Sequence, residues 1–374
     1  MSAPSKDLPR VVVDARYVGL VPHGVARYVS RLAEALADLR DGGSLPYELV
    51  FLRGRETPVD AFQGFGTVEV GAGYLSPLEW IEIPSILRKL KAAVYHSPTF
   101  SSLPSCPCPH IITIHDLNHL TYGSWKEKLY YEKLLRRFAR EASAVVTISE
   151  FSRAEIARWL DRPESEIPIV SNALESKYLL SVADQVAEPV LARHGLRARG
   201  YFLCMSNPKP HKNVGTLVEA YRSYRAQSRA SGFEPWPLVL SLREHAGVEG
   251  AISVGGLTDE EGHALLASAG GVVFPSIYEG FGLPPVEAAL AGVPLAVSDI
   301  PPHREGLVDL GPQDALWVQP RDVAGWSAAL ARIASGEQGP VPAETRPRIL
   351  SRFSVARMGR DMDQVYRRVL GLPV

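Results

Sequence analysis

Two carboxylates and two glycines gather in residues 275–288, Pro-Ser-Ile-Tyr-Glu-Gly-Phe-Gly-Leu-Pro-Pro-Val-Glu-Ala. Glu279, in the predicted loop, and Glu287, in the first turn of a predicted helix, each have two oxygens that accept hydrogen bonds, and neighbouring hydroxyls of a sugar match that geometry. Gly280 and Gly282 permit unusual backbone angles and the close approach of another molecule. The pattern indicates sugar binding; the plainer interpretation is a glycine turn with a glutamate that complements a helix dipole.

The backbone of the same segment is predicted to face an anion. The segment runs from a strand into a helix whose first turn holds two prolines, where backbone N–H groups have no partner within the helix. The N–H groups of Phe281, Gly282 and Leu283 then point beyond the strand end, where the helix dipole favours negative charge. We expect them, with Gly280, to line the binding site.

A second segment, residues 205–213, also connects a predicted strand to a predicted helix. Lys212 falls at the helix start, although the helix dipole favours an acid there. A lysine in this place is explained if a diphosphate lies between it and the helix; the alternative is a solvated lysine in a proline-rich loop. Ser206, Asn207 and Lys209 lie in the same loop and are further candidates for ligand binding.

A third segment places His115 at the end of a predicted strand, residues 110–114. A single histidine is as often structural as functional, so His115 is a candidate that needs support from elsewhere. His96, also near a strand end, is a weaker one. We expect no Asp-x-Asp pair anywhere in the chain and therefore no metal, and we assign the positive charge of the site to the protein.

Short apolar strands alternate with amphipathic helices along the whole chain, which predicts parallel sheets covered on both faces. Ligands of such sheets bind beyond the carboxyl ends of the strands. Strands are expected at 11–13, 48–52, 67–70, 93–95, 110–114, 144–148, 168–170, 201–205, 237–241, 252–254, 271–274, 294–297 and 315–318. Helices are expected at 77–91, 124–142, 152–160, 212–230, 259–269, 284–291 and 322–335, with an amphipathic helix at the end. The pattern restarts after a loop at 172–200.

Composition restricts the class of protein. With 374 residues, 46% of them hydrophobic and 22% charged, the chain is long enough for two ordinary globular domains. The 40 basic and 41 acidic residues nearly cancel, which argues against a nucleic-acid-binding module. Three cysteines do not form a disulfide framework, and the Cys106-Pro-Cys108 pair reads as a proline-rich loop. No apolar run suits a membrane span or a signal peptide, so a cytoplasmic location is expected.

Residues 275–288 resemble the signature of glycosyltransferase family 4, in which two glutamates separated by seven residues flank Gly-Phe-Gly-Leu-Pro. The resemblance implies a GT-B fold: a Rossmann-like domain over 1–180, a second over 181–352 that holds the nucleotide, and a helix over 353–374 that crosses back to the first domain. It also implies that Glu287 binds the ribose hydroxyls and Glu279 the hydroxyls of the transferred sugar.

Other segments extend the resemblance over most of the chain. Residues 205–213 look like the family's phosphate-binding loop, although Ser206 stands where many members have an arginine, which leaves Lys209 as the candidate for a second charge. His115 matches a histidine that faces the transferred sugar. Gly24 lies in a segment like the family's first loop, and Leu257 matches a backbone contact to the base.

The resemblance implies a retaining, metal-independent transfer of a hexose from a nucleoside-diphosphate sugar to a glycan or a lipid-linked acceptor. GDP-mannose is the favoured donor because the motifs resemble bacterial mannosyltransferases of polysaccharide assembly; UDP- and dTDP-sugars remain open. Two alternatives remain: a catalytically silent sugar-nucleotide-binding subunit and a sugar-nucleotide epimerase of the same fold.

Residues 124–142 suggest a further partner. They read as a basic amphipathic helix whose apolar face includes Tyr131, Leu135 and Phe138, with Trp125, Tyr130 and Leu134 left for a second surface. Such a helix makes weak, reversible contact with an anionic membrane, or packs on the sheet with a solvated basic face.

Overall fold

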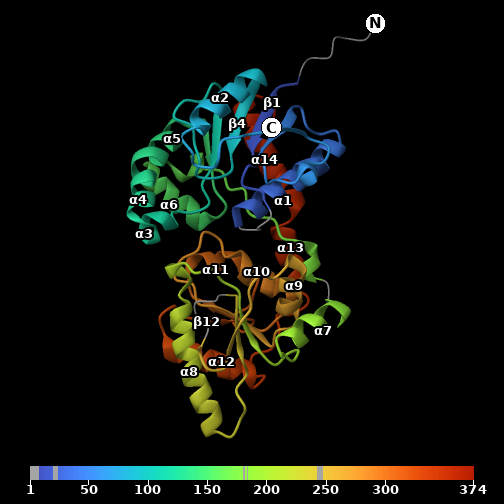
Figure 1. Ribbon diagram of the computed structural model, residues 1–374, viewed down its shortest axis with the longest axis vertical. Coiled ribbons are helices and arrows are strands. Elements are labelled where there is room, and N and C mark those ends of the chain that lie inside the picture. The colour runs from blue at the N-terminus through green and yellow to red at the C-terminus, as the bar shows by residue number, and fades with distance from the viewer. Residues whose placement is uncertain (1–7, 20–23, 180–181, 183, 242–246) are drawn as a thin grey trace. The chain divides into compact units, whose positions relative to one another are not determined.

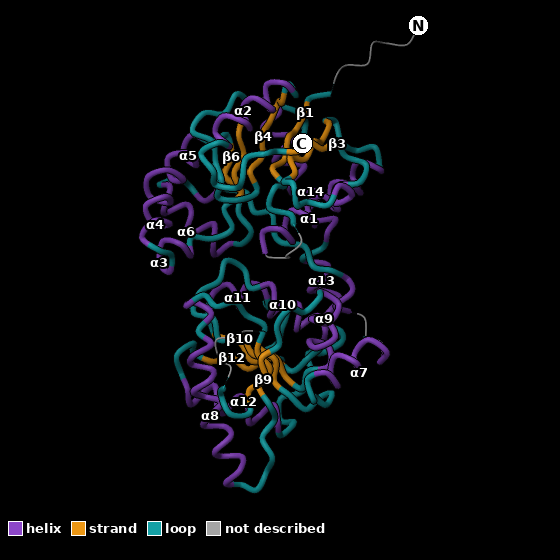
Figure 2. The backbone as a smooth tube through the Cα atoms, viewed as in Figure 1, coloured by secondary structure: helices purple, strands orange, loops and turns teal. Residues whose placement is uncertain are grey.

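The computed structural model describes residues 8–19, 24–179, 182, 184–241 and 247–374 (Figure 1). The chain forms two compact units. Unit 1 comprises residues 1–173 together with 353–374, and unit 2 comprises residues 174–352. Each unit is an α/β layer structure in which helices flank one sheet (Figure 2).

Unit 1 is built on six parallel strands in the order β3-β2-β1-β4-β5-β6. The strands are β1 (Arg10–Asp14), β2 (Glu48–Arg53), β3 (Gly66–Glu69), β4 (Ala92–Ser97), β5 (His110–Thr113) and β6 (Ala144–Val146). The helices are α1 (Gly24–Asp41), α2 (Glu79–Lys89), α3 (Asn118–Tyr122), α4 (Trp125–Tyr130), the π-helical turn η2 (Tyr131–Leu135), α5 (Arg136–Glu141), α6 (Glu150–Leu160) and α14 (Val355–Leu370).

Unit 2 repeats this topology in the order β12-β11-β10-β7-β8-β9, again all parallel. Its strands are β7 (Phe202–Cys204), β8 (Leu238–Leu240), β9 (Ala251–Ser253), β10 (Gly271–Phe274), β11 (Leu295–Ser298) and β12 (Leu316–Val318). Its helices are α7 (Asp184–Arg193), α8 (Val214–Ala230), α9 (Asp259–Ser268), α10 (Leu283–Ala291), α11 (Pro301–Gly306), α12 (Val323–Ala334) and α13 (Arg346–Arg352).

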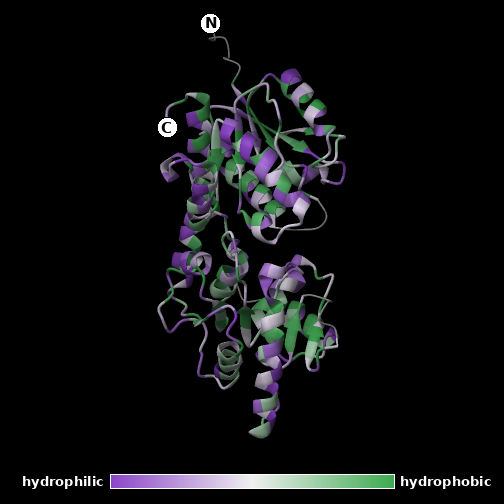
Figure 3. Ribbon diagram, turned by 90° about the vertical axis from the view of Figure 1, so that its left-hand side faces the viewer, coloured by the Kyte–Doolittle hydropathy of each residue, from purple (hydrophilic) through white to green (hydrophobic). Residues whose placement is uncertain are grey.

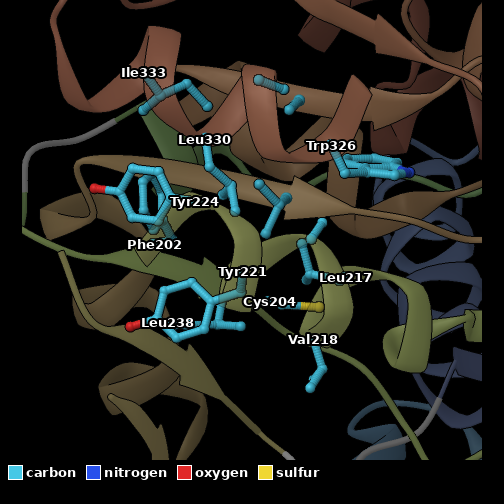
Figure 4. Close-up of a cluster of buried hydrophobic side chains, with 14 of the residues drawn as sticks. Phe202, Cys204, Leu217, Val218, Tyr221, Tyr224, Leu238, Trp326, Leu330 and Ile333 are labelled. Atoms are coloured by element: carbon cyan, nitrogen blue, oxygen red, sulfur yellow. The ribbon is translucent and has the colours of Figure 1, made fainter. Parts of the chain in front are cut away.

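The strands are apolar because both faces of each sheet are covered, and they are mostly green in Figure 3. One face of the unit 2 sheet carries α8 and α12, which pack together. Figure 4 shows Tyr221 and Tyr224 from α8 and Trp326 and Leu330 from α12 meeting strand residues such as Phe202. This packing fixes the strands whose ends carry the candidate site.

The C-terminal helix α14 belongs to unit 1, where it lies against α1 and β4. Gly359 allows the close approach to α1, because a Cβ there would lie 2.7 Å from the carbonyl oxygen of Ala35. The hydroxyl of Tyr366 lies 2.7 Å from Nδ1 of the buried His96, and Tyr47 donates to Asp363 at 2.8 Å. The predicted fold class, including a terminal helix that returns to the first domain, is confirmed.

Two expectations about elements were wrong. Residues 168–170 form an isolated bridge between Ile169 and Thr147, and no seventh strand, because Pro168 has no N–H to donate to a ladder. The stretch 172–200, expected as a loop, contains helix α7, which the sequence concealed because Pro189 lies inside it.

Candidate functional site

The loops that follow β7 and β10 meet, because these two strands are neighbours in the sheet of unit 2. The N–H of Ile277 donates to the carbonyl of His211 at 2.8 Å. Asn213 ties the loops together: its side-chain amide donates to the carbonyls of Pro275 at 2.9 Å and Pro320 at 2.7 Å. Asn213 itself adopts a left-handed conformation (φ 57°), which asparagine tolerates better than most residues. The position of Lys212 is therefore fixed by its neighbour.

Lys212 and Glu279 form an ion pair at this meeting point. The ammonium of Lys212 lies 2.7 Å and 2.9 Å from the two carboxylate oxygens, and Ser276 donates its hydroxyl to Glu279 at 2.6 Å. The two side chains are only 16% and 13% exposed. Burial opposes the charge of Glu279, but the positive charge of Lys212 and the hydrogen bonds from Lys212 and Ser276 hold the pKa of Glu279 below its usual value. A cation for phosphate and an acceptor for hydroxyls thus lie side by side.

Gly282 begins the helix that follows β10. It has φ 87°, and a Cβ at this position would lie 2.8 Å from Cδ2 of His303, so both the backbone and the space require glycine. Helix α10 then starts with prolines in its first turn, as predicted. Gly280, Phe281 and Gly282 are buried and Leu283 is half-buried.

Two predicted positions need correction. Glu287 is the fifth residue of α10, beyond the first turn expected for it, and only 2% of its surface is exposed. Lys212 ends the short turn Pro210–Lys212 and does not begin α8, because Asn213 breaks the helical conformation between them. Lys212 thereby leaves the helix axis and reaches toward Glu279.

The remaining candidates of unit 2 lie at the same edge of the sheet. Ser206 follows β7 and is fixed by Ser241, which accepts from its N–H at 2.7 Å and donates to its carbonyl at 2.8 Å. Asn207 accepts from the N–H of Lys209 at 3.2 Å, and Lys209 is exposed. Leu257 is half-buried and follows β9, two strands from β7, a separation of about 10 Å at the usual strand spacing.

His115 and Gly24 belong to unit 1. The Nε2–H of His115 donates to the carbonyl of Pro98 at 2.9 Å, and its ring meets Tyr28 edge-to-face at 4.8 Å. Burial lowers the pKa of His115, although Pro98 and Asp116 act in the opposite direction, so the imidazole is neutral and Nδ1 carries the lone pair. Gly24 is the exposed first residue of α1.

His96, the weaker histidine candidate, is structural. It is fully buried, and its two ring nitrogens lie 2.7 Å from the hydroxyl of Tyr366 and 2.8 Å from that of Thr113. Burial, with the neighbouring His110 and His115, lowers its pKa to about 3.

The expectation that the chain has no Asp-x-Asp pair is wrong, because Asp361 and Asp363 in α14 have this spacing. Asp361 lies 3.6 Å from Arg357, and Asp363 pairs with Arg367 at 2.7 Å. Within the described ranges, no group of three or more His, Cys, Asp or Glu side chains is arranged to hold a metal ion. Nor does any described helix combine the length and the apolar character needed to cross a membrane.

Three residues of the site were missed from the sequence. Ser276 and Asn213 were within the quoted motifs, but nothing in their spacing showed that they position Glu279 and Lys212. His303 follows β11, the neighbour of β10, so the rule that ligands bind after strand ends would have drawn attention to it.

Two family models and several curated relatives match the sequence of this chain. Residues 22–177 match the model of Glycosyltransferase Family 4, and residues 193–349 match that of Glycosyl transferases group 1. The chain is 34% identical over 254 residues to O-antigen chain mannosyltransferase B of Escherichia coli, covering 65% of each chain. It is 26% identical to the O-antigen chain mannosyltransferase RfbU of Salmonella typhimurium, covering 69% of this chain and 67% of that one.

Solved structures share the fold at low sequence identity. A glycosyltransferase from Rickettsia africae superimposes with a TM-score of 0.70 at 14% identity, covering 98% of this chain and 99% of that one. Anabaena HepE in complex with UDP and glucose gives a TM-score of 0.71 at 12% identity, covering 96% and 99%. The two family models divide the chain between them, so a Glycosyltransferase Family 4 domain occupies most of unit 1 and a Glycosyl transferases group 1 domain most of unit 2.

Proposed function

We propose that the protein is a retaining, metal-independent glycosyltransferase that moves a hexose from a nucleoside-diphosphate sugar to a glycan or a lipid-linked acceptor. The observation that carries the proposal is the pairing of Lys212 with Glu279 between the ends of β7 and β10, beside the start of α10. A diphosphate needs a cation and a helix N-terminus, and a sugar needs a fixed hydroxyl acceptor. All three lie together here.

Each residue receives a role from this arrangement. Lys212 binds the diphosphate, with Ser206, Asn207 and Lys209 in the same loop. Glu279 accepts from hydroxyls of the transferred sugar, Glu287 binds the ribose, and the backbone near Leu257 contacts the base. Along the sheet, Glu279 and Glu287 follow β10, the loop of Lys212 follows the neighbouring β7, and Leu257 follows β9, so a nucleotide laid across these strand ends would be within reach of them.

The remaining candidates, His115 and Gly24, belong to unit 1. Nδ1 of the neutral His115 accepts a hydroxyl of the transferred sugar, since Nε2 is engaged by Pro98. Gly24 is a candidate contact to the nucleotide-sugar donor.

In the reaction, the acceptor oxygen bonds to the anomeric carbon on the face from which the diphosphate leaves. The bond between the anomeric carbon and the diphosphate oxygen breaks, and that oxygen takes the acceptor's hydroxyl proton, so the charges balance. Configuration is retained because attack and departure occur on the same face. Lys212 and the N–H groups of Phe281, Gly282 and Leu283 stabilise the negative charge that grows on the leaving group, where preorganised donors act most strongly.

GDP-mannose is the proposed donor, supported by the names of the mannosyltransferases to which the chain is similar. The test is thermal unfolding with GDP, UDP, dTDP and ADP, because a ligand that binds only the folded state raises its apparent stability. We expect the largest shift with GDP. A larger shift with UDP or dTDP would assign another donor.

Slow breakdown of the donor separates the three candidate activities. A transferase without acceptor releases nucleotide slowly, an epimerase changes the sugar without release, and a silent subunit does neither. NMR of the anomeric proton during transfer to a mannosyl acceptor tests retention of configuration, and activity in the presence of EDTA tests metal independence.

The proposed location is the cytoplasmic side of the membrane, with weak peripheral contact through α4 and η2. The support is exposure: Trp125, Leu129 and Leu134 present 71%, 51% and 36% of their surfaces to solvent beside basic side chains. Tyr130, expected on this surface, turns inward and donates to the carbonyl of Phe100 at 2.8 Å.

A further inference from the structure

The buried histidine His303 borders the candidate site, and the proposed function assigns it no step. His303 lies on α11, directly after β11, and only 1% of its surface is exposed. Its Nδ1 lies 3.0 Å from the carbonyl oxygen of Ser298. A carbonyl only accepts, so the ring proton is on Nδ1 and Nε2 carries a lone pair. Among the described residues, this buried Nε2 has no hydrogen-bond partner, which is uncommon for a buried polar atom.

The unpartnered edge of the ring faces the loop that holds Glu279. A Cβ built on Gly282 would lie 2.8 Å from Cδ2 and 3.3 Å from Nε2 of His303, so this edge contacts the start of α10. Burial lowers the pKa of His303, the negative charge of Glu279 raises it, and the positive charge of Lys212 lowers it. The imidazole therefore senses both members of the ion pair.

The other charged groups around His303 do not replace these two. On α11 itself, Arg304 pairs with Asp299 at 2.7 Å, and both are partly exposed. Glu305 follows on the same helix, and α10, which packs against α11, contributes the buried Glu287. The cation among these groups, Arg304, is paired with Asp299, so Lys212 remains the cation that acts on the ring.

We infer that His303 takes up a proton when a nucleoside diphosphate binds, and that the imidazolium is the second positive charge of the site. The inference rests on the proposed function. A diphosphate draws the ammonium of Lys212 away from Glu279 and adds negative charge beside α10, and both changes favour a proton on Nε2. Lys209, the other cation of this loop, is exposed, so water and salt screen its charge more than they would screen the charge of a buried imidazolium.

Calorimetry counts the proton directly. GDP and, in parallel, UDP are titrated into the whole protein at pH 7.0 in buffers of low and high ionisation enthalpy, and the difference in heat gives the protons taken up. We expect the wild type to take up more protons than His303→Asn, whose amide still donates to Ser298 but lacks the second ring nitrogen. His263→Asn, a histidine of α9 in the same unit, is the matched control and should behave as the wild type.

The wild type alone provides a second measurement, which needs no variant. Its Kd for the nucleotide should rise by up to tenfold per pH unit on the alkaline side of the titration, as one linked proton requires. Equal proton uptake in the wild type and in His303→Asn, or a wild-type Kd that is flat from pH 6 to 8.5, overturns the inference. Absence of any binding of GDP, UDP or dTDP would instead contradict the proposed function.

Discussion

At the scale of single residues, the site depends on charges that compensate each other. Lys212 and Glu279 are mostly covered, so each needs the other or a ligand to offset its loss of water. Glu279 has a further donor in Ser276, whereas Lys212 has its two bonds to the same carboxylate. Removal of Lys212 would leave Glu279 with the hydrogen bond from Ser276, whereas removal of the Glu279 carboxylate would cost Lys212 both of these hydrogen bonds.

Lys212→Ala should weaken nucleotide binding by roughly 10- to 150-fold, because a charge-assisted hydrogen bond contributes about 1.5–3 kcal/mol. Calorimetry with GDP measures the loss, and turnover of donor should fall with it. Lys209→Ala is the control: its side chain is exposed, so the loss should be much smaller. Wild-type affinity and turnover in Lys212→Ala would remove this lysine from the site.

Substitutions of the two glutamates should affect the binding of different ligands. Glu287→Gln should weaken binding of the bare nucleoside diphosphate, since ribose is present in it. Glu279→Gln should leave that binding nearly intact and depress sugar transfer, because the transferred sugar is present only in the full donor. Calorimetry with both ligands, together with a transfer assay, distinguishes the roles, and the opposite pattern would mean that they are exchanged.

At the scale of elements, a π-helical turn determines which side chains α4 and its continuation expose. Leu134 follows Leu129 by five residues. In a regular α-helix, two residues five apart point in different directions, whereas the wider π turn brings them to the same side of the helix. Inward, Tyr131, Leu135 and Phe138 are buried as the sequence predicted. The exposed apolar set is therefore fixed by the turn.

Vesicle co-sedimentation tests this surface. The wild type should bind vesicles with anionic lipid better than neutral ones at low salt, and less so at physiological salt, because the basic side chains are screened. The double variant Trp125→Ala/Leu129→Ala should lose most of this binding. Phe233→Ala, at a 72% exposed aromatic of unit 2, should not. Negligible binding of the wild type to both kinds of vesicle would favour an acceptor free in solution.

At the scale of the whole molecule, stability should fall in acid. Burial lowers the pKa of His110 to about 4, and His96 lies near 3, whereas both titrate near 6.5 when unfolded. Between these values the unfolded chain binds more protons, so the free energy of unfolding decreases as pH falls from about 6.5 toward 3, by up to about 1.4 kcal/mol per unit for each histidine.

Urea unfolding at pH 7, 6 and 5 measures this slope. His110→Phe keeps a ring against Tyr95, whose centroid lies 5.4 Å away, and removes one titrating group, so its slope should be shallower than that of the wild type. A wild-type unfolding free energy that is constant over this range would contradict the assignment of these histidines as buried and neutral.

The sequence predicted much of this molecule because its signals were local. Strand runs and Gly-Phe-Gly-Leu-Pro after a strand specify their own elements, and the resemblance supplied the order of domains. The features that the sequence did not predict depend on contacts between distant segments. These contacts join Asn213 to Pro320, Tyr366 to His96, and His303 to Gly282. Helix α7 was missed for a local reason, since a proline inside a helix looks like its end.

The assignment of α14 to unit 1 has a consequence for how the protein is made. Residues 1–173 leave the ribosome before any of unit 2, yet their buried surface around Ala35 and His96 is covered by α14, which is translated after all of unit 2. Unit 2 is continuous in sequence, so it is able to finish folding during synthesis, as domains generally do. Unit 1 is therefore the first to be synthesised and the last to complete its folding. Nascent chains interrupted before residue 353 should therefore carry an incomplete unit 1 whose exposed apolar surface engages chaperones.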